Sequence, residues 1–173
     1  MLKLAWIAVA GAGALASARA PHLSPQLDGL SFLVGNWASG RGHVADTGGT
    51  STGRSMITEE VGGNVLLRRD HTDLFDAAGK PSGSLEQVMM IYPEDGSVHA
   101  DYSDGTHIIH YVTTEIVAGH SVIFTSEHKA NSPTFRLRYE LTRPTTLSVT
   151  FQMAAPGSAD FHLVAAGSLT KAS

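Results

Sequence analysis

The sequence predicts an all-β fold, namely an up-and-down antiparallel β-barrel of about eight to ten strands with a short N-terminal helix closing one end. From Gly35 onward, apolar and polar residues alternate with a period of two, which is typical of strands that bury one face. Turn residues such as Asp95-Gly96 and Asp104-Gly105 separate the apolar runs. Within this pattern, helix-length segments do not follow the strands, so a parallel sheet of strand–helix–strand units is excluded.

The spacing of the apolar runs predicts about ten strands. They are expected near residues 36–44, 52–60, 64–74, 85–92, 97–103, 106–116, 120–128, 134–141, 146–154 and 161–171. Strands that follow one another this regularly favour a closed barrel, because closure removes the unpaired sheet edges. A sandwich of two sheets is the alternative arrangement.

The strands at 134–141 and 146–154 carry the clearest alternation, and they predict which side chains point inward. The expected buried residues are Phe135, Leu137, Tyr139, Leu147, Val149, Phe151 and Met153. Their neighbours, including Arg136 and Arg138, are expected to face solvent. Arg68, Arg69, Asp70 and Asp73 are likewise interpreted as surface ion pairs on adjacent strands.

The helix is expected directly before the first strand. Ser24 is a suitable N-cap residue, and Pro25 suits the first helical position. Leu27, Leu30 and Leu33 then fall on one face of the helix. Such an apolar face indicates a plug across one end of the barrel.

The first twenty residues have the pattern of a secretory signal peptide. A short segment containing Lys3 precedes the apolar run from Leu4 to Ala16, and Ala18-Arg19-Ala20 supplies the small residues that a signal peptidase recognises. The alternative is an uncleaved anchor, but about 13 apolar residues are fewer than the roughly 20 that span a bilayer. We therefore expect residues 1–20 to be removed, leaving one barrel domain at 21–173 in the periplasm or outside the cell.

The composition limits the classes of function. The chain has 12 basic and 16 acidic residues, a formal net charge of −4, and it lacks a basic run, so nucleic acid is an unsuitable partner. The absence of cysteine excludes disulfides, thiol catalysis and thiolate metal sites. Stable insertion into a membrane is not expected after cleavage. The oligomeric state is not indicated.

The run from Leu30 to Trp37, LSFLVGNW, resembles the start of the first strand in calycin-type barrels. Three later stretches, LEQVMMIYPEDGSVHADYSDGTHIIHY, FRLRYEL and FQMAAPG, are similar to a group of uncharacterised exported bacterial lipocalin-like proteins. That resemblance covers nearly all of the chain after residue 20. It implies a barrel that holds a ligand in its interior, and it implies no particular activity.

A more distant similarity is to nitrobindin-type haem barrels, whose first strand reads Gly-x-Trp-x-Gly-x-Gly. The segment from Gly35 to Gly42 matches that pattern with one extra residue. The resemblance implies haem as a cofactor, held by a histidine that opens the last strand, and His162 stands at that place. In the alternative, the more apolar face with Phe161 and Leu163 points inward, and His162 faces solvent.

The histidine-rich hairpin around Asp104-Gly105 suggests a metal site. A two-residue turn there would place His99 directly opposite His110, with Asp101 two residues along on the same face. Directly opposed residues are about 5 Å apart, so these three side chains could hold one divalent metal ion. The alternative is that they are ordinary residues on the outer face.

A binding protein without catalytic activity is the favoured function: an exported barrel that holds a small hydrophobic or amphipathic molecule. The residues expected to line its interior are Trp37, Tyr102, His107, Tyr111, Tyr139 and Phe151. No catalytic residue is assigned, because the sequence has no nucleophile-elbow motif, and whether the protein is an enzyme stays open. The alternatives are a haem barrel, a hydrolase and an interaction module with a filled core.

Overall fold

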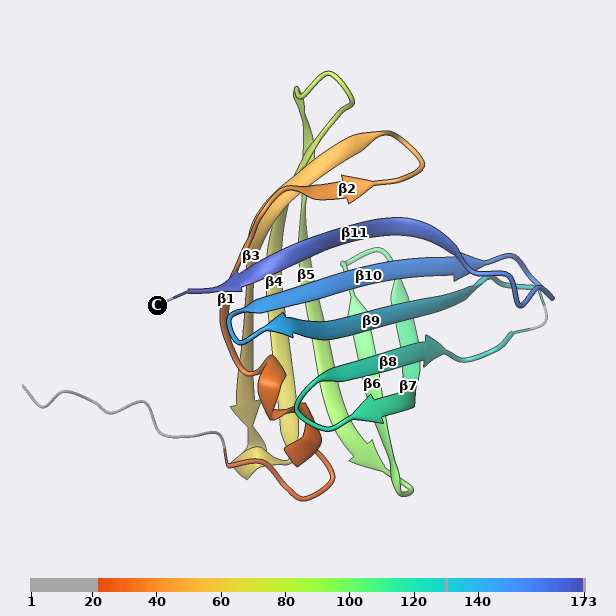
Figure 1. Ribbon diagram of the computed structural model, residues 1–173. Helices are drawn as coiled ribbons and strands as arrows, with labels where there is room; N and C mark the ends of the chain where they lie inside the picture. Colours follow the sequence, from red (N-terminus) through yellow and green to blue (C-terminus); the bar gives the residue numbers. More distant parts are fainter. Residues whose placement is uncertain (1–21, 130, 173) are drawn as a thin grey trace, which may run out of the picture.

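Eleven strand segments form one antiparallel sheet that closes on itself (Figure 1). The computed structural model describes residues 22–129 and 131–172, so the expected signal peptide and its cleavage site lie outside the described residues. The strands are β1 (Gly35–Ser39), β2 (Gly42–Val44), β3 (Gly49–Glu60), β4 (Val65–Phe75), β5 (Pro81–Glu94), β6 (Ser97–Ser103), β7 (Ile108–Val117), β8 (Ser121–Ser126), β9 (Thr134–Arg143), β10 (Thr146–Ala154) and β11 (His162–Lys171). Two short 3₁₀ helices, η1 (Asp28–Leu33) and η2 (Val61–Gly63), complete the described elements.

The sheet closes because β1 and β2 each pair with both β3 and β11. These two segments therefore share one strand position, and the barrel has ten positions. From β3 to β11, each strand pairs with the next one in the chain. The predicted up-and-down antiparallel barrel is confirmed, and the alternative sandwich is wrong.

The shared position is the main departure from the predicted strand pattern. The strand expected at 36–44 is interrupted between β1 and β2, where the Gly40 N–H donates to the carbonyl oxygen of Ser168 at 3.0 Å. Beside the break, β2 and β11 approach closely: a Cβ atom on Gly167 would lie 3.3 Å from the Cα of Gly42. Glycine allows this contact between the two backbones.

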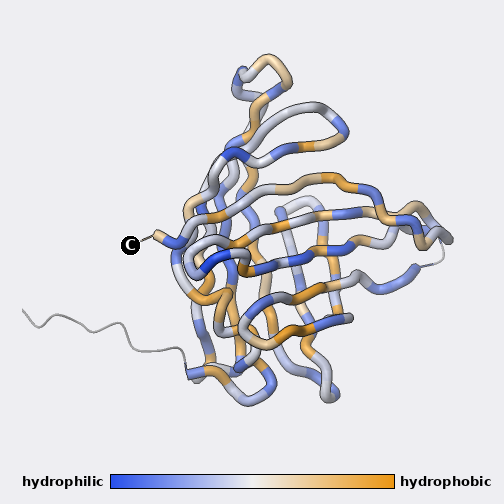
Figure 2. Tube along the Cα trace, in the orientation of Figure 1, coloured by the Kyte–Doolittle hydropathy of each residue, from blue (hydrophilic) through white to orange (hydrophobic). Residues whose placement is uncertain are grey.

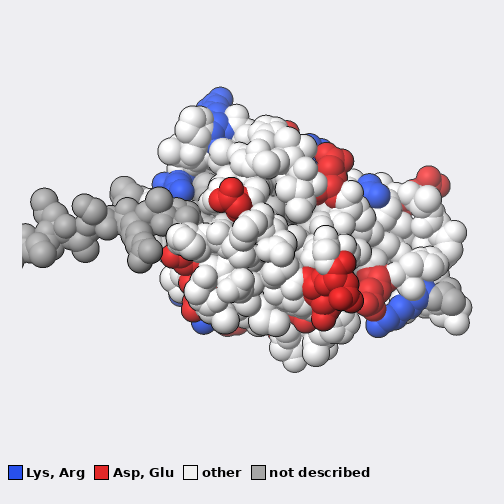
Figure 3. Space-filling view, turned by 90° about the horizontal axis from the view of Figure 1, so that it is seen from below, with Lys and Arg blue, Asp and Glu red and all other residues white. Residues whose placement is uncertain are grey.

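Helix η1 covers the lower end of the barrel (Figure 1). It is a 3₁₀ helix, and its three residues per turn place Leu27, Leu30 and Leu33 on one face, where all three have no exposed surface. The predicted plug is therefore present. The predicted N-cap is wrong, because the Ser24 hydroxyl is buried without a hydrogen-bond partner and only its carbonyl oxygen accepts, from the N–H groups of Leu27 and Asp28. Seen from below, the barrel shows mainly uncharged side chains, with acidic and basic side chains in several separate places (Figure 3).

The hairpin between β6 and β7 has a different register from the predicted one. Its last pair is Ser103 with Ile108, so the loop has four residues rather than two. The carboxylate of Asp104 accepts the backbone N–H groups of Thr106 and His107, at 2.9 and 2.7 Å, and thereby holds the wider loop. Because the register shifts by two residues, every side chain keeps its predicted face.

Hydropathy alternates along the strands (Figure 2), and the predicted inward face of β9 and β10 is correct. Leu137, Tyr139 and Leu147 are buried. The other residues expected inside are half-buried, namely Phe135, Val149, Phe151 and Met153. On the outer face, Arg138 forms an ion pair with Glu140 at 3.1 Å.

Truncation of the plug should weaken the whole barrel. Leu30→Ala removes a fully buried side chain, and we expect a loss of about 2–5 kcal/mol in the free energy of unfolding because a cavity remains. The matched control is Ile108→Ala, whose side chain is 69% exposed, and its effect should stay within about 0.5 kcal/mol. Urea denaturation of both variants measures the difference, and equal losses would contradict the described role of η1.

Candidate ligand-binding site

The barrel encloses a cavity of about 580 Å³ above the leucine plug. Its lining includes residues from β1 to β7 and from β9 to β11. His107 lies on the loop between β6 and β7, lines the cavity and has a 74% exposed side chain, so the cavity reaches solvent at that end. A volume of this size suits a drug-sized molecule.

One wall of the cavity is apolar. Its side chains come from β9, β10 and β11, where the rings of Phe135 and Phe151 stack with their centroids 5.6 Å apart. The other residues of this wall are small or aliphatic: Leu137, Val149, Ala165, Ala166, Gly167 and Leu169. Small residues on β11 leave room in the lumen, so a flat ring system can lie against this wall.

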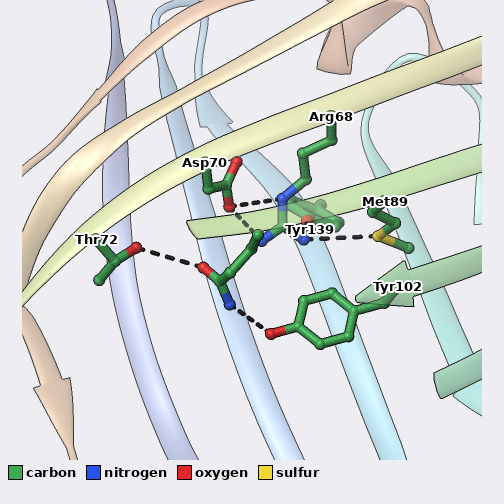
Figure 4. Close-up of polar contacts among 7 residues, drawn as sticks. Arg68, Asp70, Thr72, Met89, Tyr102 and Tyr139 are labelled. Carbon is green, nitrogen blue, oxygen red and sulfur yellow. Dashed lines mark hydrogen bonds and ion pairs between the residues drawn. The ribbon is translucent and has the colours of Figure 1, made fainter. Parts of the chain in front are cut away.

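The opposite wall, formed by β3 to β6, is mostly polar. Gln87 lies in its middle, where its Nε2 donates to the Tyr102 hydroxyl at 2.6 Å and its Oε1 accepts from Thr72 at 3.4 Å (Figure 4). Hydroxyl and charged groups continue along the same strands. The further polar members are Ser51, Ser55, Arg68, Asp70 and Asp104.

A buried ion pair stands at the inner end of the polar wall. Arg68 and Asp70 are two residues apart on β4, so both point inward, and Arg68 Nε donates to Asp70 Oδ2 at 2.7 Å (Figure 4). A second nitrogen of Arg68, Nη2, also contacts this oxygen. The third, Nη1, donates to the Tyr139 hydroxyl on β9 at 2.5 Å and thus connects the two walls.

Burial and charge act in opposite directions on this pair. Burial lowers the pKa of the Arg68 guanidinium, but Tyr139 and Asp70 raise it more, so the net pKa lies above its ordinary value and the group stays charged. Burial raises the pKa of Tyr139 to about 12, although Arg68 lowers it. Asp70 Oδ1 is buried and has no hydrogen-bond partner among residues 22–129 and 131–172. The cluster is thus an ion pair with one unmatched acceptor.

Five of the six residues predicted to line the interior do so. Tyr102, His107, Tyr111, Tyr139 and Phe151 line the cavity, as the strand alternation indicates. Trp37 does not, because it is buried below the cavity. Its indole N–H donates to the Leu33 carbonyl oxygen at 2.8 Å, and it packs with the plug.

The structure does not place His162, the predicted haem ligand, in the cavity. His162 pairs with Met153 at the start of β11, beyond an irregularity in the strand register, and its side chain is exposed. The residues of β11 that line the cavity are Ala165, Ala166, Gly167 and Leu169. His107 lies at the solvent end, where its ring Nδ1 is 3.0 Å from Asp104 Oδ2. Of the described histidines, only His107 lines the cavity, and its side chain is 74% exposed, so the cavity does not enclose a buried imidazole that could serve as an axial haem ligand.

The predicted metal triad is also wrong, because it depended on the two-residue turn. In the observed register His99 faces Val112, and its ring stacks on Tyr92 with centroids 6.0 Å apart. Asp101 pairs instead with His110, at 2.7 Å between Oδ1 and Nδ1. Within the part of the chain that the structure describes, no group of three His, Cys, Asp or Glu side chains is arranged to hold a metal ion.

The sequence interpretation missed Arg68 and Asp70, which it placed on the surface. A signal was present: Leu66, Arg68, Asp70, Thr72 and Leu74 have one parity, and both ends of that series are leucine. The opposite parity of the strand also contains a leucine, Leu67, so the pattern alone did not decide the face. Arg69, in contrast, is exposed as predicted.

Comparison with known proteins shows resemblance to other barrels. No protein-family model matches the chain. No curated protein matches it either. Among solved structures it is similar to a redesigned β-barrel, mFAP0, bound to DFHBI, with 13% identity and a TM-score of 0.42, covering 81% of this chain and 99% of that one. It is also similar to a DUF3598-family protein of unknown function from Nostoc punctiforme PCC 73102, with 8% identity and a TM-score of 0.29, covering 87% and 100%.

Neither structural likeness is close enough to assign a family, so the calycin-type and nitrobindin resemblances stay predictions. Helices in the described part of the chain are too short to cross a membrane.

The ion pair generates a stability prediction. Asp70→Ala leaves the Arg68 guanidinium buried without its carboxylate, and we expect a loss of about 3–5 kcal/mol in the free energy of unfolding. The double variant Arg68→Met, Asp70→Leu removes both charges and should be neutral or gain about 1–4 kcal/mol. Urea denaturation distinguishes them. A double variant as unstable as Asp70→Ala would mean that the pair itself stabilises the fold.

Proposed function

We propose that this protein is an exported, lipocalin-like carrier that binds a small amphipathic molecule inside its barrel and catalyses no reaction on it. The observation that carries this proposal is the two-sided cavity, with an apolar wall on β9–β11 and a polar wall on β3–β6. An apolar ligand body gains by leaving water, while a few fixed polar groups orient its polar end.

The floor of the barrel supports the lipocalin-like assignment. Gly35-Asn36-Trp37 follows η1 directly, and Trp37 is buried against the plug while Lys171 on the last strand lies over its ring, 5.4 Å from the centroid. The motif thereby joins the first strand, the last strand and the plug. A floor built in this way keeps one end closed, so a ligand enters from the end near His107.

The buried pair supports a binding role over a purely structural one. Taking Arg68 and Asp70 out of water costs free energy that apolar side chains would not cost. A barrel with a filled core would gain nothing from them. Polar groups at the inner end of a cavity are useful when they recognise the polar end of a ligand.

Filling the cavity should abolish binding without unfolding the protein. Ala165 lies on the apolar wall, where it pairs with Phe151 of the neighbouring strand β10. The substitution Ala165→Phe puts a ring into the lumen. We expect the affinity for Nile red, an uncharged dye that fluoresces in apolar surroundings, to fall about tenfold or more, which is about 1.4 kcal/mol.

The matched control is Ser168→Phe, because Ser168 is exposed on the same strand with the opposite parity. Its affinity for Nile red should equal that of the unmodified protein, as measured by fluorescence titration. Equal binding by the Ala165 variant, with an unchanged thermal unfolding midpoint, would refute the cavity as the binding site.

Export is tested separately. The small residues at Ala18 and Ala20 predict cleavage between Ala20 and Pro21, or within two residues of it. N-terminal sequencing of the protein from the periplasmic or extracellular fraction of a bacterial host should find a chain that begins near Pro21. Recovery of a chain with Met1 intact in the membrane fraction would show an anchor instead.

A further inference from the structure

Three tyrosine side chains reach the cavity beside the buried arginine. Tyr102 lies on β6, Tyr111 on β7 and Tyr139 on β9, and all three line the cavity together with Arg68. Phe124 positions two of these rings, because it makes edge-to-face contacts with Tyr111 and Tyr139 at centroid distances of 6.4 and 6.5 Å. Three phenol groups from different strands therefore gather at one end of the lumen.

Where these hydroxyls form hydrogen bonds, the oxygen accepts and the proton is not donated. A phenol can donate one hydrogen bond and can also accept. The Tyr139 oxygen accepts from Arg68, and the Tyr102 oxygen accepts from Gln87. The Tyr111 hydroxyl forms no hydrogen bond within residues 22–129 and 131–172. Within the same residues, the hydroxyl protons of Tyr102 and Tyr139 have no acceptor.

Acceptor groups near the tyrosines are, in contrast, already engaged or enclosed. Asp70 Oδ2 accepts from Arg68, and Asp70 Oδ1 is the one buried acceptor here without a hydrogen-bond partner among the described residues. Gln87 Oε1 accepts from Thr72. The inner end of the cavity thus offers mainly hydrogen-bond donors to a ligand, three hydroxyl protons beside one enclosed acceptor.

The charge of this end is balanced. The guanidinium of Arg68 is paired with the carboxylate of Asp70, so the two charges cancel. A carboxylate ligand would bring an uncompensated negative charge into a buried site, which is costly. A neutral acceptor oxygen avoids that cost.

We propose, on the basis of the carrier function above, that the ligand is a flat, uncharged ring compound whose carbonyl oxygen accepts hydrogen bonds from Tyr102, Tyr111 and Tyr139. Its rings lie against the stacked Phe135 and Phe151 of the apolar wall. Burial raises the pKa of Tyr111 and of Tyr102 above the ordinary value, as it does for Tyr139, so these hydroxyls keep their protons at neutral pH.

Three compounds with one ring skeleton test the proposal: fluorene, 9-fluorenone and fluorene-9-carboxylate. Each competes with Nile red in a fluorescence displacement titration against the full chain. We expect 9-fluorenone to bind about tenfold more tightly than either of the others, because only its carbonyl meets unpaired donors without adding charge.

Tyr111→Phe identifies the donor. This substitution removes a hydroxyl that has no hydrogen-bond partner among the described residues and keeps the ring, so the fold is preserved. The preference for 9-fluorenone over fluorene should fall severalfold, with fluorene affinity unchanged. In the control, Tyr92→Phe, the lost hydroxyl contacts Asp101 at 3.2 Å on the outer face, and the preference should not change.

Each other outcome decides against the proposal in its own way. Equal affinity of the unmodified protein for fluorene and 9-fluorenone overturns the carbonyl site but leaves the carrier function intact. Tightest binding of the carboxylate overturns it in favour of an anionic ligand. Binding of none of the three compounds, nor of Nile red, overturns the carrier function and the carbonyl site together.

Discussion

Closure of the sheet is the constraint on which the rest of this structure depends. The chain has no cysteine, so its two ends are joined only by the pairing of β1 and β2 with β3 and β11. That pairing gives every strand two neighbours and leaves no edge open among the described strands. At this closure, which we call the seam, the strand position is interrupted between β1 and β2, and Gly42 lies close to Gly167. The lumen beside this seam is lined by small residues, and the cavity extends there.

Much of the fold follows from the sequence because antiparallel alternation and turn residues are local signals. The predicted strands lie within a few residues of the observed ones, and the inward face of β9 and β10 is correct. The metal-site prediction was wrong because it depended on a strand register. The Asp104 carboxylate widens a turn that the Asp-Gly pair alone predicts to be tight, and this moves His110 from His99 to Asp101. For His162, the register of β11 is irregular near its start, so counting residues along the strand does not show where its side chain lies.

The candidate site was harder to predict because it breaks the rule that inward residues are apolar. Arg68 and Asp70 have the composition of a solvated strand face, and sequence reasoning placed them there. Only the three-dimensional arrangement shows that the hydroxyl of Tyr139, 71 residues away along the chain, accepts a hydrogen bond from Arg68. Such exceptions are expected at functional sites, where polar residues can occupy inward positions because they recognise a ligand. Aromatic residues such as Tyr102 and Tyr111 were found because their pattern agrees with the ordinary rule.

The two-sided character of the cavity has its origin in the topology. In an up-and-down barrel, strands that are consecutive in the chain are neighbours in space, so each half of the sequence builds half of the wall. The cavity-lining residues between 51 and 104 are mostly polar, and those between 135 and 169 are mostly apolar. The difference in polarity between these two parts of the chain therefore becomes a difference in polarity between two walls of the lumen. Because Arg68 on the polar wall donates a hydrogen bond to Tyr139 on β9, the two halves of the wall meet at the inner end of the cavity.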